Sequence, residues 1–314
     1  MRDGSPRRMT FFRRELVVMD AGLVPGWLGP ILLSALLLGF YDVAKKHAVR
    51  DNPVAPVLFW SNLCGTFLLL GGLLAAGVLR EALQCAPREW TLILGKAVLV
   101  AASWACVYYA MRELPISIAA PVRASSPLWV FLGGVLIYGE IPTLLQAAAM
   151  LMIFGGYFAF AVFGKLENID WRRHKGVWAI AAGTLLGAGA ALYDKYLLNV
   201  LHLDFRQVQC YFSLNLVLVL GLFYLFRRKR REQPFRWRWT VAATGILLIA
   251  ADFCYFYAVS LPDIRISVLS LVRRSNCVVS FALGAAIFRE RFLGRKGFAL
   301  ALILLGVALL AAAK

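Results

Sequence analysis

The sequence is poor in charged residues and in the residues from which metal sites are built. Charged side chains make up 16% of its 314 residues, and it has three histidines and six cysteines. No two cysteines stand in a CxxC spacing, and all but Cys85 lie in apolar stretches, as expected for small hydrophobic residues. We therefore expect no metal and no cofactor. The sequence also offers no nucleophile or acid–base pair at catalytic spacing, which argues against a membrane-embedded lipid enzyme.

Apolar residues are present in large excess. They make up 61% of the chain, and the mean hydropathy is +0.71. A soluble domain is nearer half apolar and a quarter charged. The composition predicts a multi-pass integral membrane protein, with the lipid bilayer as its surroundings. We expect it in the cell's inner (plasma) membrane.

The net charge of +17 does not indicate nucleic-acid binding. Five arginines lie in the basic arm at residues 1–26, and residues 227–231 are all arginine or lysine. Basic loops beside apolar spans are topology signals and contacts for anionic lipids, and no nucleic-acid motif accompanies them. Lysine and arginine are concentrated in loops after odd-numbered helices, which favours cytoplasmic odd loops and outward termini.

Ten apolar runs of spanning length follow the basic arm, separated by short charged or proline-containing breaks. The predicted helices are 27–46, 54–79, 90–112, 116–139, 142–164, 175–199, 206–226, 237–260, 264–288 and 294–313. The sequence thus predicts an all-α membrane protein with ten transmembrane helices.

The first five predicted helices are related to the second five. Several short motifs recur in the same order at offsets of about 150 residues, and the recurring positions are Asp42 and Asp194, Trp90 and Trp239, Arg123 and Arg273, and Glu140 and Glu290. Five helices per unit is an odd number, so consecutive units insert in opposite orientations, with a binding site between them. We expect two inverted repeats, residues 27–164 and 165–314.

Two segments resemble the EamA family of the drug/metabolite transporter superfamily. They are YGEIPTLLQAAAMLMIFGGYFAF, which begins at Tyr138, and FRERFLGRKGFALALILLGVALL, which begins at Phe288. Leu-Pro turns at residues 114–115 and 261–262 add to the likeness. The resemblance implies a ten-helix fold with helices 1–4 and 6–9 around a substrate cavity, and carriage of small metabolites without ATP. It also implies cytoplasmic termini, which conflicts with the loop charges, so the orientation stays open.

Cations inside the apolar helices are the first candidates for substrate binding, because charge in the bilayer interior is costly and rarely kept without a role. They are Arg123, Arg273, Arg274 and Lys96. A guanidinium is permanently charged and matches carboxylate or phosphate. The alternatives are structural ion pairs with intramembrane aspartates or, for Lys96, an ammonium that reaches the headgroups.

Asp42, Asp194 and Asp252 are the intramembrane acids. They could bind a substrate amine, carry a coupling proton, or neutralise Lys45, Lys195 or the arginines. Trp104 and Tyr255 are the aromatic candidates for the cavity wall. Glu140 and Glu290 are expected in loops or caps, and Gly183 and Gly187 at a close helix contact.

The predicted function is secondary transport of a small anionic or zwitterionic metabolite by alternating access, in a monomer or homodimer. An amino acid, an organic acid or a phosphorylated compound would suit five intramembrane cations (Lys195 included) against three acids. The alternatives are a flippase or exchanger of lipid-linked sugars or sugar phosphates, and an anion channel.

Overall fold

The computed structural model describes residues 26–49, 52–113, 123, 125–162, 174–228, 234–262, 264–276, 278–279, 283 and 293–312. Every regular element within these ranges is helical. The elements before residue 163 are α2 (Leu28–Val49), α3 (Val54–Ala75), the short α4 (Leu79–Ala82), α5 (Pro87–Glu113), α7 (Ser126–Tyr138) and α8 (Leu144–Val162). The later elements are α9 (Lys175–Lys195), the π-helical turn η1 (Tyr196–Val200), α10 (Phe205–Arg228), α11 (Trp239–Ser260), α12 (Ile266–Arg273) and α14 (Leu293–Ala312).

Six of the described helices are long and apolar enough to cross a membrane, and they are α2, α3, α5, α9 with η1, α10 and α11. Shorter apolar helices lie at Ser126–Tyr138 and Leu144–Gly156. The all-helical membrane class is therefore confirmed. The count of ten spans stays a prediction, because parts of the predicted helices 116–139 and 264–288 lie outside the described residues.

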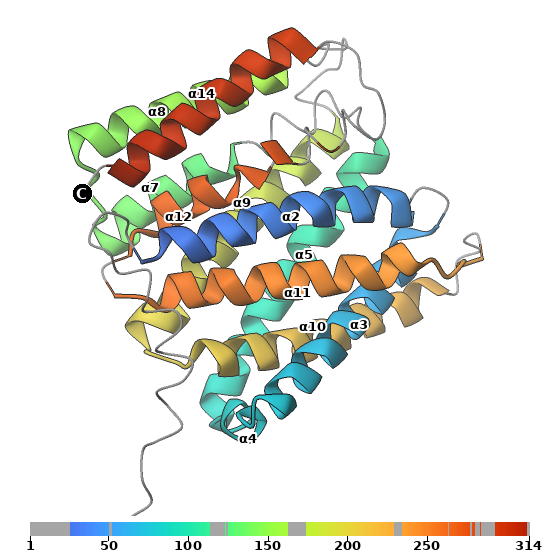
Figure 1. The fold of residues 1–314 in the computed structure, drawn as a ribbon. Helices are drawn as coiled ribbons and strands as arrows, with labels where there is room; N and C mark the ends of the chain where they lie inside the picture. Colours follow the sequence, from blue (N-terminus) through green and yellow to red (C-terminus); the bar gives the residue numbers. More distant parts are fainter. Residues whose placement is uncertain are drawn as a thin grey trace, which may run out of the picture.

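Helices from the two ends of the chain pack against each other. The main partners are α2 with α11, α5 with α9, and α8 with α14, while α3 contacts both α10 and α11, and α7 contacts both α9 and α12. Figure 1 shows α8 and α14 side by side at one edge, and α2 and α11 crossing the middle. The largest hydrophobic core joins residues of α2, α5 and α9 to α12.

Small residues allow the closest helix crossings. At the α3–α11 crossing, a Cβ atom on Gly65 would lie 2.6 Å from the Gly245 carbonyl oxygen, and one on Gly245 would overlap the Ser61 carbonyl. At the α5–α9 crossing, a Cβ on Gly183 would lie 3.0 Å from the Ser103 carbonyl oxygen. The Ser103 hydroxyl donates to the Gly183 carbonyl at 2.7 Å. The glycine spacing in the sixth predicted helix thus marks a close contact, as expected.

Candidate functional site

A buried ion pair joins α5 to α9. The Lys96 ammonium of α5 contacts the Asp194 carboxylate of α9, and the two residues are 1% and 5% exposed. The ammonium also lies over two rings, 4.1 Å from the centroid of Phe212 and 3.8 Å from that of Phe256. A cation held by both a carboxylate and two aromatic faces is well compensated for its loss of water. Asp194 is therefore paired with Lys96, not with its neighbour Lys195.

A second ion pair lies beside the first and joins α11 to α12. Arg273 contacts the carboxylate of Asp252, and the guanidinium carbon of Arg273 lies 4.0 Å from the centroid of the Tyr255 ring. Tyr255 is 3% exposed and interacts with Asp194 through its hydroxyl. Tyr255 thus connects the two pairs. We name Lys96, Asp194, Asp252, Tyr255 and Arg273 the central charge cluster.

Asp42 lies at the border of this cluster on α2. Its carboxylate accepts hydrogen bonds from Lys45 at 2.9 Å and from Asn276 at 2.8 Å. Its tyrosine neighbour, Tyr41, interacts electrostatically with Asp252, Arg273 and Arg123 as well as with Asp42. The side chains of Asp42 and Lys45 are 32% and 30% exposed, so this pair is far more accessible than Lys96 and Asp194.

The structure brings together most of the candidates from the sequence. Lys96, Asp194, Asp252, Tyr255 and Arg273 form the central charge cluster, with Asp42 and Arg123 near it through Tyr41. Trp104 lies about two turns beyond Lys96 on α5 and packs against the main hydrophobic core. Arg274 is half-buried at the C-terminal cap of α12, where its amide donates to the Ser270 carbonyl at 3.2 Å.

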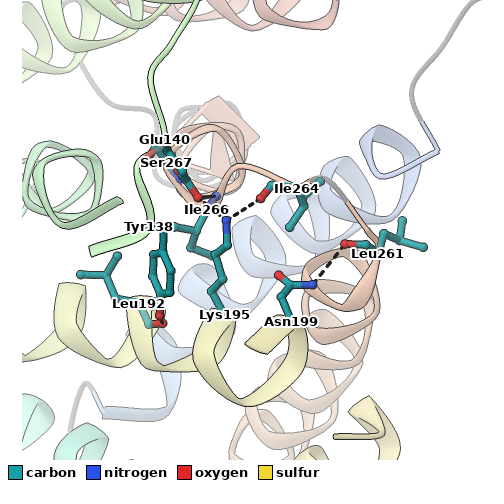
Figure 2. Close-up of polar contacts among 9 residues, drawn as sticks. All are labelled: Tyr138, Glu140, Leu192, Lys195, Asn199, Leu261, Ile264, Ile266 and Ser267. Atoms are coloured by element: carbon teal, nitrogen blue, oxygen red, sulfur yellow. Dashed lines mark hydrogen bonds and ion pairs between the residues drawn. The ribbon is translucent and has the colours of Figure 1, made fainter. Parts of the chain in front are cut away.

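A third set of polar contacts lies where α7 and α9 end and α12 begins (Figure 2). The Glu140 carboxylate accepts hydrogen bonds from the Lys195 ammonium at 2.6 Å, the Ser267 hydroxyl at 2.6 Å and the Ile266 amide at 2.9 Å. The Lys195 ammonium also donates to the Ile264 carbonyl at 2.8 Å. We name Glu140, Lys195, Ile264, Ile266 and Ser267 the Glu140 cluster.

The hydrogen bonds around Glu140 lower the pKa of its carboxyl group. Burial alone would raise the pKa of Glu140, but the hydrogen bonds from Lys195, Ser267 and the Ile266 amide outweigh it and hold the pKa below the ordinary carboxyl value. Glu140 is 7% exposed. An ionised carboxylate at the first amides of α12 is favoured by that helix's dipole. Glu140 therefore caps a helix other than its own.

Backbone geometry places the Glu140 side chain. Gly139 ends α7 with φ of 65°, a left-handed conformation that favours glycine. Gly134 leaves room for the carboxylate, because a Cβ there would lie 2.8 Å from Glu140 Oε2. Two further bonds fasten the same end of the bundle, from the Tyr138 hydroxyl to the Leu192 carbonyl at 2.7 Å and from the Asn199 amide to the Leu261 carbonyl at 3.2 Å (Figure 2).

From the sequence, Glu140 and Glu290 are expected in loops or caps. Glu140 is at a helix cap, and Glu290 lies outside the described residues. The only sequence signal for a role in joining distant helices was the recurrence of glutamate at the same place in both halves of the chain. The structure also changes the charge balance at the centre. Lys195, counted among five intramembrane cations, is neutralised by Glu140. Among the described residues, no group of three or more His, Cys, Asp or Glu side chains could hold a metal ion.

These features define a class of protein. The described part of the chain has six helices of spanning length, and two ion pairs that would be costly in lipid join its helices, which is typical of a membrane transporter. The chain belongs to the EamA-like transporter family, whose model matches residues 27–162 and again residues 174–312. The resemblance found in the sequence is thereby confirmed.

Individual relatives are distant. The pseudopaline exporter CntI of Pseudomonas aeruginosa, in strains UCBPP-PA14 and PAO1, is 25% identical over 150 residues. That match covers 44% of this chain, and the chain spans about half (51%) of the relative's length. A crystal structure described only as that of a protein has a TM-score of 0.74 at 18% identity, covering 90% of this chain and 95% of that one. This likeness shows the fold.

Proposed function

We propose that this chain is a secondary transporter, not an enzyme, and that it carries a small anionic or zwitterionic metabolite by alternating access across the plasma membrane. The observation that carries the proposal is the central charge cluster. It places two cations and two carboxylates between helices, with Lys96 and Asp194 almost inaccessible. Buried ion pairs contribute little to stability compared with apolar replacements, so their presence favours a role in binding.

The charges of the cluster suit a substrate with both carboxylate and amine groups. A substrate carboxylate or phosphate can take the place of Asp194 or Asp252 beside Lys96 or Arg273. A substrate amine can in turn satisfy the displaced aspartate. Because each cation has an acidic partner, the structure favours a zwitterion more than the sequence did. An amino acid or an amino-bearing organic acid is the first choice, and a phosphorylated compound the second.

The helix contacts support two inverted repeats, residues 27–164 and 165–314, in a ten-helix fold. In this arrangement α2 is equivalent to α9, α3 to α10, α5 to α11, α7 to α12 and α8 to α14. Exchanging each helix for its equivalent turns the α2–α11 contact into the α5–α9 contact. The same exchange turns α3–α11 into α5–α10, and it leaves α3–α10, α7–α12 and α8–α14 unchanged. A contact pattern that survives this exchange is what a pseudo-two-fold axis between repeats would give. The two matches to the family model support the same arrangement.

The test is a thermal-stabilisation screen on purified protein, followed by counterflow in proteoliposomes. The probes are L-aspartate, L-glutamate, L-lysine, citrate and glucose 6-phosphate, so that acids, zwitterions and phosphates are each represented. Arg273→Ala should abolish stabilisation by the active probe, whereas Arg80→Ala, at an exposed position on α4, should not.

Each alternative predicts a different result. Saturable counterflow supports a carrier, while conductance without counterflow would indicate an anion channel. Translocation of a lipid-linked sugar without transport of any soluble probe would favour a flippase. CntI is an exporter by name, so efflux is the direction to assay first. Stabilisation that survives in Arg273→Ala would overturn the assignment of the site.

A further inference from the structure

Two neighbouring residues at the end of α9 serve two different sets of contacts. Asp194 contacts Lys96 in the central charge cluster, whereas Lys195 contacts Glu140. Successive residues of a helix point about 100° apart. The last turn of α9 therefore presents the Asp194 carboxylate to α5 and the Lys195 ammonium to the ends of α7 and α12. Any rotation or shift of this turn changes both ion pairs together.

Helix α12 has the same double arrangement. Its first residues, Ile266 and Ser267, donate to the Glu140 carboxylate, and its last residue, Arg273, pairs with Asp252. The eight residues of α12 span only about 11 Å, so the helix moves as one short rod. Both α9 and α12 therefore join the central charge cluster to the Glu140 cluster, and Glu140 joins the two helices to each other.

The helical geometry changes immediately after Lys195. Residues Tyr196–Val200 form a π-helical turn, and the Leu201 amide donates to the Tyr196 carbonyl at 3.0 Å. π-Helical turns are rare, occur mostly as single turns inside α-helices, and are found frequently at functional sites. The turn also contacts the end of α11, through the bond from Asn199 to the Leu261 carbonyl.

We propose that Asp194 and Lys195 couple occupancy of the central charge cluster to closure of the end of the bundle that the Glu140 cluster fastens. This inference rests on the proposed function. A substrate that replaces Asp194 and Asp252 as partners of Lys96 and Arg273 frees α9 and α12 to shift. The shift withdraws the Lys195 ammonium and the first amides of α12 from Glu140, and that end opens. Glu140, Asp194 and Lys195 are positioning residues in this scheme, acting through α9 and α12.

The coupling can be tested without knowing the substrate. Spin labels at Ile141→Cys and Val200→Cys, positions 75% and 51% exposed, report the distance between the α7–α8 connection and the end of η1. The labels are placed in a variant whose native cysteines are replaced, and pulsed electron paramagnetic resonance is measured in nanodiscs. Wild-type protein should give one narrow distance distribution, and Glu140→Gln a longer and broader one.

The decisive variant is Lys96→Met, which leaves every residue of the Glu140 cluster unchanged. If the clusters are coupled, it lengthens the distance as Glu140→Gln does. Lys45→Met, which removes the partly exposed partner of Asp42, and Glu81→Gln, at an exposed position on α4, should keep the wild-type distribution.

The outcomes separate the parts of the proposal. A longer distance in Glu140→Gln but not in Lys96→Met would overturn the coupling and leave the proposed transport function intact. No change in Glu140→Gln would overturn the closing role of Glu140. Asp194→Asn removes the charge of the other partner of the same ion pair and is nearly identical to the wild type in shape. It is measured alongside, so that a folding defect in Lys96→Met cannot decide the result. Failure of the transport function itself would appear in the counterflow assay, not in these distances.

Discussion

Replacing Lys96 and Asp194 singly and together measures what their pairing does. Removing one partner of a buried ion pair costs about 3–5 kcal/mol, because the other charge is left uncompensated, so Lys96→Met and Asp194→Leu should each be strongly destabilising. The double variant places apolar side chains at both positions, and such replacements are often neutral. Lys96 also loses its contacts with Phe212 and Phe256, worth up to about 2 kcal/mol, and a methionine sulfur against the rings restores about 0.3–1.5 kcal/mol.

The double variant should therefore lie within about 2 kcal/mol of the wild type, with a coupling free energy of about 3 kcal/mol or more. The assay is reversible unfolding in mixed micelles with sodium dodecyl sulfate. The matched control is Lys45→Met with Asp42→Asn, whose side chains are about one-third exposed and should couple by about 0–1 kcal/mol. Equal coupling in the two cycles would refute the reasoning. A folded double variant that still transports at the wild-type rate would remove this pair from the substrate site.

Three further predictions concern other parts of the molecule. Gly245→Ala should lower the melting temperature sharply, because its Cβ would overlap the Ser61 carbonyl, whereas Gly71→Ala, with open space around it, should be neutral or stabilising. The depressed pKa of Glu140 means that its contribution to stability is complete above the ordinary carboxyl pKa and is lost as pH falls through the folded value. The melting temperatures of wild type and Glu140→Gln should therefore differ most near neutral pH and converge in acid. Arg273→Lys keeps the charge beside Asp252 but loses the planar fork, so counterflow should show an apparent affinity reduced by about tenfold.

Much of the fold was predictable because it depends on local composition. Apolar runs of spanning length set the membrane class, and charged breaks set helix ends within a few residues, as at Val54 and Lys175. The π-helical turn was not predictable, because residues 196–199 read as the last turn of the ordinary apolar helix predicted at 175–199. The turn packs against the end of α11, which lies about 60 residues later in the chain.

The candidate residues of the centre were predictable from their cost in lipid, but their partners were not. Lys96 and Asp194 are joined only because α5 packs against α9. Glu140 has an ordinary local sequence, and its role depends on a helix start 126 residues later in the chain, at Ile266. Pairing between distant segments is a property of the packed bundle, which a single sequence does not display.

The packing of early helices against late ones has a consequence for biosynthesis. Among the described elements, α2, α5 and α8 have their main partners in α11, α9 and α14, which leave the ribosome later. These early helices must therefore wait in the bilayer without their main partners, open to proteases and to wrong partners, until the later helices are inserted. Residues 1–164 and 165–314, produced as two polypeptides in one cell, should protect each other from degradation, whereas either one alone should be short-lived.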